Sequence, residues 1–203
     1  MSAPARSPQA SAPAAPSPTG LPPTAGAAEA AFRAAARGWS TGVAVVTTRA
    51  GDEVFAKTVS SFCTLSLDPL LVTVAVSRHS PLAAAVRGSG RFAVSVLTSR
   101  QIAVARRFAA PGAGRALGVF TAVPMRPVTT GAPVLEDALA WFDCRLHGLL
   151  PGGDHTILVG RVAAAGSDIE TDSGSDAEDP LLYHDGQYRL LAPAPLTSTG
   201  VGT

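Results

Sequence analysis

The sequence predicts a mainly β fold, an antiparallel barrel that carries a few helices. Apolar runs of strand length outnumber the segments with helical spacing, and most of them follow one another along the chain. They do not alternate regularly with helices, as the strands of a parallel sheet do. No G-x-G-x-x-G or Walker loop occurs either, so nothing favours a Rossmann fold. Together these observations indicate an antiparallel barrel.

The chain is expected to begin its fold with a helix and a hairpin. An alanine-rich helix is predicted over 28–37 and should end at Gly38. A buried strand follows over 42–48. Turn residues at 49–52 then lead into a second strand over 54–60.

The next predicted elements are a strand, a short helix and another strand. The strand over 70–76 follows a proline, and the later strand covers 91–97. Between them, Ser80 and Pro81 stand in the order of an N-cap and a first helical residue. We therefore expect a short helix that runs to Val86.

Residues 99–109 are helical by pattern. Ile102, Ala105 and Phe108 recur at helical spacing and should face the core. The Pro-Gly pair at 111–112 should end this helix.

Two long strands are predicted near the C-terminal end of the domain. They cover 140–149 and 155–165 and flank a turn at 151–154. A last strand over 187–191 could close the sheet.

The composition limits the partners and the compartment of the protein. Hydrophobic residues make up 46% of the chain, charged residues 15%, and the net charge is +1. This balance predicts a soluble protein with no nucleic-acid partner and no membrane partner. Cys63 and Cys144 stand far apart without a C-x-x-C pair, which favours a reducing cytoplasm over a disulfide framework.

The two ends of the chain differ in composition from its middle. Residues 1–27 are nearly all Ala, Pro, Ser, Gly and Thr, and such a segment cannot bury enough apolar surface to offset the entropy lost on ordering. Its prolines also interrupt any apolar stretch of a secretory signal. We expect disordered tails at 1–27 and 193–203, one domain over 28–192, and an acidic solvated loop at 168–179, for which metal binding is the weaker alternative.

One polar segment, at 57–69, lies between strongly apolar strands. Its hydroxyl side chains and free backbone amides could bind a planar, hydrogen-bonding ring or a phosphate. A ligand site at the mouth of a barrel is the default expectation for such a segment. The hydroxyl-bearing residues are Thr58, Ser60, Ser61, Thr64 and Ser66.

From about Phe32 to Leu190 the sequence resembles the flavin reductase-like family, whose fold is the flavin-binding split barrel. No single motif carries this resemblance, but their order and spacing form a specific combination. The matching motifs are FR at 32–33, WSTGV at 39–43, TVSSFCTLS at 58–66, DP at 68–69, RFAVSVL at 91–97, ARRF at 105–108, GDHT at 153–156 and PLLYH at 180–184.

The resemblance implies roles for individual residues. The segment at 58–61 should lie along the isoalloxazine ring, the turn at 77–80 near the flavin tail, and Arg106 on the phosphate side. His155 should lie beside the nicotinamide and is the expected catalytic residue. The full set of expected cofactor-binding residues is Thr41, Thr58, Val59, Ser60, Ser61, Phe62, Cys63, Ser66, Ser77, Ser80, Arg106, Phe108, Asp154 and His155.

The function implied by the resemblance is an NAD(P)H:flavin oxidoreductase. It would reduce FMN or FAD with NADH, or with NADPH as the alternative donor, and supply free reduced flavin to a partner monooxygenase or halogenase. Relatives of this kind are usually homodimers. Two alternatives share the barrel: a non-enzymatic flavin-binding protein and an oxidase similar to the pyridoxamine phosphate oxidases. The GDHT motif favours the reductase over both.

Each candidate residue also has a structural interpretation. The hydroxyls at 58–66 could form local bonds at a strand edge, and Arg106 and Arg107 could both be solvated. A lone histidine such as His155 is usually structural. Cys63 lacks a neighbouring histidine or second cysteine, so packing near the flavin is expected and redox chemistry is not. No metal site is expected, because His79, His147 and His184 show no metal-ligand spacing.

Overall fold

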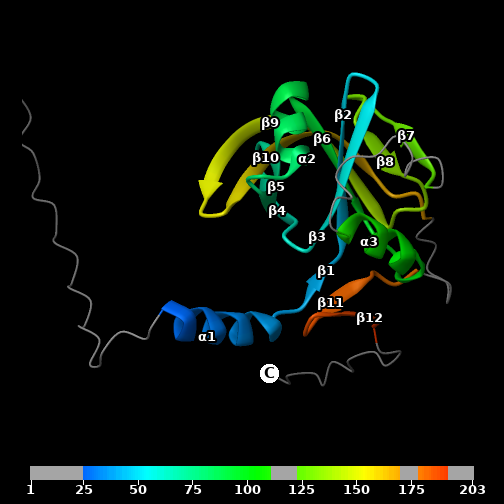
Figure 1. The fold of residues 1–203 in the computed structure, drawn as a ribbon. Helices are drawn as coiled ribbons and strands as arrows, with labels where there is room; N and C mark the ends of the chain where they lie inside the picture. Colours follow the sequence, from blue (N-terminus) through cyan, green and yellow to red (C-terminus); the bar gives the residue numbers. More distant parts are fainter. Residues whose placement is uncertain (1–24, 111–122, 170–177, 192–203) are drawn as a thin grey trace, which may run out of the picture. The chain divides into compact units, whose positions relative to one another are not determined.

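The computed structural model describes residues 25–110, 123–169 and 178–191 (Figure 1). Contacts between residues divide the chain into two compact units, Met1–Ala36 and Arg37–Thr203, and each is described by itself. Both expected tails lie largely outside the described residues. So do most of the expected acidic loop and the Pro-Gly pair at 111–112.

Helix α1 (Ala25–Arg37) accounts for the described part of the first unit. It begins three residues before the expected start, and its alanine-rich sequence favours helix throughout. Glu29 and Arg33 form an ion pair of 2.7 Å one helical turn apart. Within the described residues no helix is both long and apolar enough to cross a membrane.

The second unit is built on one antiparallel sheet of seven strands in the order β3-β2-β6-β9-β10-β5-β4. β3 also contacts β5, although four strands separate them in the sheet, so the sheet curls back on itself. Its edge strands share no hydrogen-bonded ladder among the described residues. The predicted mainly β, antiparallel fold is confirmed. The strands are β2 (Ala44–Ala50), β3 (Glu53–Val59), β4 (Cys63–Leu67), β5 (Leu70–Ser77), β6 (Arg91–Val96), β9 (Ala140–Gly152) and β10 (His155–Gly166).

Two small sheets complete the unit. β7 (Met125–Pro127) pairs with β8 (Pro133–Leu135), and β1 (Thr41–Gly42) pairs with β11 (Leu182–His184), which pairs in turn with β12 (Gln187–Arg189). The prediction that 187–191 closes the main sheet is therefore wrong. Asp185 and Gly186 both have positive φ, as the two central residues of a tight hairpin turn require. That turn folds β12 directly back onto β11.

The helices of the second unit lie where the sequence predicts them. α2 (Pro81–Ser89) begins after Ser80 and outlasts its expected end at Val86 because Gly90, with φ +67°, ends it. The predicted helix over 99–109 forms as a 3₁₀ turn, η1 (Ser99–Gln101), followed by α3 (Ile102–Ala109). Ala105 and Phe108 are fully buried and Ile102 packs beside them, as predicted.

The long hairpin of β9 and β10 brings distant parts of the chain together. Its turn is tighter than expected and consists of Gly153 and Asp154, with Gly153 at φ +68°. On its other side, β10 pairs with β5, so His155 stands opposite both Gly152 and Ser77. The Arg78 amide donates to the Asp154 carbonyl at 3.0 Å, which ties the hairpin turn to the end of β5.

Gly160 allows close packing across three neighbouring strands. A Cβ atom at this position would lie 2.5 Å from the Cζ of Phe92 on β6 and 2.9 Å from the Cβ of Cys144 on β9. Phe92 is fully buried, so its ring cannot move away without disturbing the core. The ring therefore spans β9 and rests on the bare backbone of β10.

We predict that Gly160→Ala destabilises the fold by about 1–3 kcal/mol, the usual cost of overpacking a core. Gly148→Ala on β9 is the matched control, because nothing lies within 4 Å of its added Cβ. Urea denaturation of both variants measures the free energy of unfolding. Equal stability of the two variants would contradict this account of the packing.

Candidate functional site

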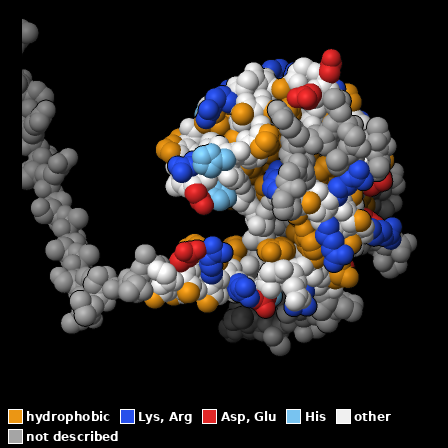
Figure 2. Space-filling model, viewed as in Figure 1, with side chains coloured by type: hydrophobic (Ala, Val, Ile, Leu, Met, Phe, Trp, Pro, Cys, Tyr) orange, Lys and Arg blue, Asp and Glu red, His pale blue; other side chains and the backbone are white. Residues whose placement is uncertain are grey.

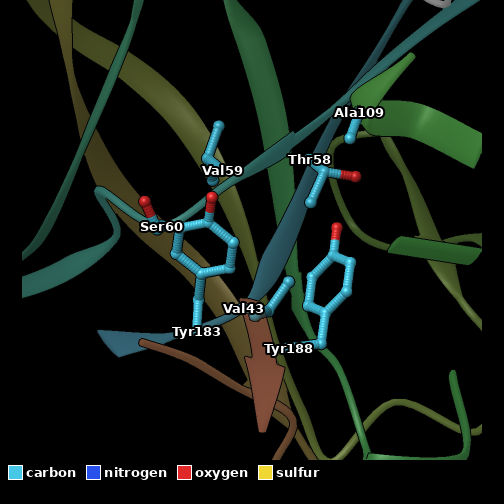
Figure 3. Close-up of a pocket in the computed structure, with 7 residues that line it drawn as sticks. All are labelled: Val43, Thr58, Val59, Ser60, Ala109, Tyr183 and Tyr188. Atoms are coloured by element: carbon cyan, nitrogen blue, oxygen red, sulfur yellow. The ribbon is translucent and has the colours of Figure 1, made fainter. Parts of the chain in front are cut away.

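The end of β3 and the residues that follow it form a wall between two cavities. Thr58, Val59 and Ser60 line both of them. We call the larger one the histidine cavity and the smaller one the tyrosine cavity. The histidine cavity, of about 370 Å³, is lined by Lys57, Thr58, Val59, Ser60, Ser61, Ala75, Val76, Ser77, Ser80 and His155. The tyrosine cavity, of about 210 Å³, is lined by Val43, Thr58, Val59, Ser60, Ala109, Tyr183 and Tyr188 (Figure 3).

Strand pairing builds the histidine cavity. β5 contributes its last residues, and β10 begins beside them with His155 opposite Ser77. Ser80, the N-cap of α2, follows at the end of the same connection. The structure thus places seven of the expected site residues around one cavity, although they come from distant parts of the chain. These are Thr58, Val59, Ser60, Ser61, Ser77, Ser80 and His155.

Two of the hydroxyls in this segment hold the backbone in place. Thr58 Oγ1 donates to the Ala105 carbonyl on α3 at 2.7 Å. Ser61 Oγ donates to the Ala75 carbonyl at 2.8 Å and accepts from the Ala75 amide at 3.1 Å. These two side chains therefore have a structural role, although their partners are distant in the sequence and not local as the structural interpretation expects. They fix the segment between α3 and β5.

Other hydroxyls remain available to a ligand. Among the described residues, no hydrogen-bond partner is found for the side chains of Ser60, Ser77 and Ser80, and the first two residues are exposed. Lys57 contributes a cation at the rim, where its Nζ donates to the Ala109 carbonyl at 3.2 Å. The cavity thus combines apolar walls with a few hydroxyl groups, as ligand pockets commonly do.

His155 is the only histidine that lines the cavity. Its Nδ1 lies 2.7 Å from Oδ1 of Asp154, and its side chain is 47% exposed. The hydrogen bond with His155 is the main reason that the pKa of Asp154 falls below its usual value, with Arg78 contributing least. Histidine side chains lie beside basic and acidic ones at the tip of the β9–β10 hairpin (Figure 2). The expected exposure of His155 at a strand start is confirmed.

Two tyrosines form one wall of the tyrosine cavity. The Tyr183 and Tyr188 rings meet edge to face, with centroids 5.7 Å apart. Both hydroxyl groups point toward the segment that carries Thr58 and Val59 (Figure 3). Burial and the neighbouring Tyr183 raise the pKa of Tyr188, while Arg106 opposes the shift. Tyr188 therefore stays a neutral hydrogen-bond donor at physiological pH.

Arg106 and Thr41 lie on the tyrosine side of the wall. Arg106 is exposed, yet its charge acts on Tyr188, so it stands near the tyrosine cavity although it does not line it. Arg107 is exposed as well. Thr41 pairs with Tyr183 in the β1–β11 ladder, and its buried hydroxyl has no partner among the described residues.

Four other expected site residues line neither cavity. Phe62 packs on the core, with its ring 5.2 Å from that of Phe142. Ser66 accepts the Asp68 amide at 3.2 Å in the turn before β5. Phe108 is fully buried in α3, and Cys63 is exposed on the edge strand β4. Only the first part of 58–66 faces the cavities, because the chain then leads into the edge strand β4.

The described residues offer neither a reactive thiolate at Cys144 nor a cluster of metal ligands. Burial, together with the carboxylate of Asp143, raises the pKa of Cys144 to about 12, so its thiolate does not form at neutral pH. Across residues 25–110, 123–169 and 178–191, no three His, Cys, Asp or Glu side chains are arranged to hold a metal ion.

Sequence reasoning missed several lining residues. Tyr183 stands in the PLLYH motif, but nothing in that motif marks its tyrosine as a cavity residue. Tyr188 stands in the expected last strand, and only the β11–β12 turn brings it beside Tyr183. The apolar Val43, Ala75, Val76 and Ala109 carry no signal that distinguishes a cavity wall from ordinary core.

Known proteins that are similar to this chain include flavin reductases and reductase components of oxygenases and halogenases. Residues 36–192 match the family described as flavin reductase like domain, which begins close to the boundary at Ala36. The chain is 38% identical over 161 residues to the reductase component of 4-hydroxyphenylacetate 3-monooxygenase from Thermus thermophilus, covering 79% of this chain and 95% of that protein. It is 36% identical over 160 residues to the NADH-dependent FMN reductase AsuE2 of Streptomyces nodosus subsp. asukaensis, covering 79% and 83%.

A solved structure agrees with these relatives. BorF, the flavin reductase component of a bacterial two-component tryptophan halogenase, superposes with a TM-score of 0.71. The two chains are 36% identical, and the superposition covers 80% of this chain and 98% of BorF.

Proposed function

Because this chain belongs to the flavin reductase-like domain family, we propose that it is an NADH:flavin oxidoreductase that reduces FMN or FAD. The observation that carries this proposal is the histidine cavity, where His155 faces the same space as the segment at 58–61. Relatives named as an NADH-dependent FMN reductase and as a monooxygenase reductase component support it. NADH is the preferred donor in this proposal because it is the one these names give.

The residues of the histidine cavity fit a flavin ring. Val59, Ala75 and Val76 offer apolar contacts to a planar ring, and the hydroxyls of Ser60 and Ser77 have no partner among the described residues. A volume of about 370 Å³ lies within the range of small-ligand sites. When bound, flavin supplies an acceptor for the hydride that NADH donates. Ser80 and the turn at 77–80 are proposed to lie near its tail.

The protein's task in this reaction is to hold two rings in contact. Hydride transfer requires close, face-to-face placement of donor and acceptor more than it requires a strong acid or base. The cavity suits this requirement, since His155 and Lys57 are the only ionisable side chains among the described residues that line it. The segment at 58–61 would hold the flavin, and His155 would orient the nicotinamide.

The flavin is proposed to leave after reduction. Ser60, Ser61 and Ser77 are exposed and His155 is half exposed, so a ring bound here would be only partly enclosed. Partial enclosure favours exchange over permanent retention. We propose that a separate flavin-dependent monooxygenase or halogenase receives the product, because the Thermus relative and BorF are components of such systems. We propose a cytoplasmic location, which the two free cysteines, Cys63 and Cys144, support.

The first prediction concerns the need for added flavin. The purified full chain should oxidise NADH rapidly only when free FMN or FAD is supplied, because flavin is the hydride acceptor. The loss of the near-ultraviolet absorbance of reduced nicotinamide, measured against a blank with the same flavin and no protein, follows the reaction. NADPH in the same assay tests the choice of donor. Tight flavin retention without NADH oxidation would favour the non-enzymatic flavin-binding alternative.

The second prediction separates the two halves of the site. His155→Ala should slow reduction of bound flavin by about 10- to 100-fold, the effect of about 1.4–2.7 kcal/mol on the barrier. Flavin affinity should stay almost unchanged, because the segment at 58–61 is held by α3 and β5 and not by His155. Stopped-flow reduction and a flavin titration measure the two effects. An equal loss in both assays would remove His155 from this role.

The chain is also proposed to act as a homodimer. The sheet edge at β4 exposes three leucines, Leu65, Leu67 and Leu70, with Leu67 88% exposed. A second copy of the same edge would cover them, and exposed apolar edges otherwise promote aggregation.

Analytical ultracentrifugation should therefore find a dimer at micromolar concentration. Leu67→Lys should shift the sample toward monomer, because it places a charge in the proposed contact. Leu190→Lys is the matched control, since Leu190 is 64% exposed and follows β12, which belongs to a different sheet from β4. A monomeric wild-type chain would exclude this proposal.

A further inference from the structure

Asp154 stands next to the histidine cavity without lining it. Its Oδ1 lies 2.7 Å from Nδ1 of His155, and its side chain is 87% exposed. The cavity wall includes His155 but not Asp154. Asp154 therefore acts on the cavity only through the imidazole ring of its neighbour.

The backbone on both sides of this pair is fixed. His155 is the first residue of β10 and is held in register with Gly152 on one side and Ser77 on the other. The Asp154 carbonyl accepts the Arg78 amide at 3.0 Å. What remains free is the rotation of the His155 side chain and the position of its proton. The carboxylate of Asp154 restricts both.

We propose that Asp154 is a positioning residue that keeps the proton of neutral His155 on Nδ1. The carboxylate accepts a hydrogen bond from Nδ1–H, so the other ring nitrogen, Nε2, presents its lone pair as an acceptor. The partner of Nε2 follows from the proposed function. It is the N–H of a carboxamide such as the one on the nicotinamide ring. Without Asp154, no described group would hold the proton on Nδ1, and Nε2 would no longer be fixed as the acceptor.

No other described group competes for Nδ1. Arg78, whose charge acts on Asp154, donates from Nε to His79 Nε2 at 3.1 Å. The lowered pKa of Asp154 keeps its carboxylate ionised throughout the neutral range, so it remains an acceptor there. The pair is exposed, so its energy is small, but choosing between two tautomers requires little energy.

The test measures the tautomer directly in the full chain. ¹⁵N-edited NMR of the histidine rings, with the His155 signals identified by their loss in His155→Ala, reports which nitrogen carries the proton. The wild type should show Nδ1–H. Asp154→Ala should shift the balance toward Nε2–H, and Asp154→Asn, which retains a carbonyl oxygen, should fall between them. Asp52→Ala, an exposed turn aspartate of the β2–β3 hairpin, should change nothing.

Kinetics provide the second readout. Asp154→Ala should slow reduction of bound flavin by about 2- to 5-fold, as expected for the loss of one exposed hydrogen bond to a carboxylate. In the His155→Ala background the same substitution should have no further effect, because the residue acts through the imidazole. Flavin affinity should not change. Additive losses in the two backgrounds would overturn the proposal.

The two readouts keep this inference separate from the proposed function. An unchanged tautomer in Asp154→Ala overturns the positioning role even if the enzyme reduces flavin. A shifted tautomer in a protein that does not oxidise NADH supports the positioning role and overturns the proposed reaction.

Discussion

The register of β10 between β9 and β5 is the constraint on which the rest of the site depends. It places His155, the first residue of β10, opposite Ser77, the last residue of β5. These two residues are far apart in the sequence. A shift by one residue would turn every side chain of β10 to the other face of the sheet. The same strand carries Gly160, where the Phe92 ring rests on bare backbone, so core packing and site geometry support the same register.

Some hydroxyl groups of the site hold the backbone in place, and others are exposed in the cavity, where a ligand could bind them. Thr58 and Ser61 use their hydroxyls to fasten one segment to α3 and to β5. Ser60 and Ser77 keep theirs exposed toward the cavity. A rigid wall with few free hydrogen-bonding groups suits the placement of planar rings, because preorganised contacts lose little entropy on binding.

The shared wall connects the histidine cavity with the tyrosine cavity. Thr58, Val59 and Ser60 face both, so a ligand that contacts this segment is close to His155 on one side and to the two tyrosines on the other. On the tyrosine side, Arg106 acts on the pKa of Tyr188, and the buried Thr41 hydroxyl has no partner among the described residues. This arrangement explains why residues expected in one site are distributed over two adjoining spaces.

The sequence by itself determined most of the local structure. The β9–β10 hairpin and α3 could be predicted because turn residues and helical spacing act between neighbours in the chain. β4 could not, since its exposed, hydroxyl-rich residues form a strand only where β5 offers an edge to pair with. Likewise, the sequence did not show that β12 pairs with β11 and lies outside the main sheet. A turn with positive φ at Asp185 and Gly186 joins β11 to β12.

The family resemblance carried by the motifs also indicated the candidate chemistry, including the role proposed for His155. Only the tertiary structure decided that His155, Ser77 and Thr58 line one cavity, while Phe108 lies in the core. It also decided that Ser61 bonds to β5 and that Tyr183 and Tyr188 stand together. The physical reason is that hydrogen-bonded pairing and side-chain packing join residues far apart in the chain, and local sequence patterns do not encode which distant segment becomes the partner.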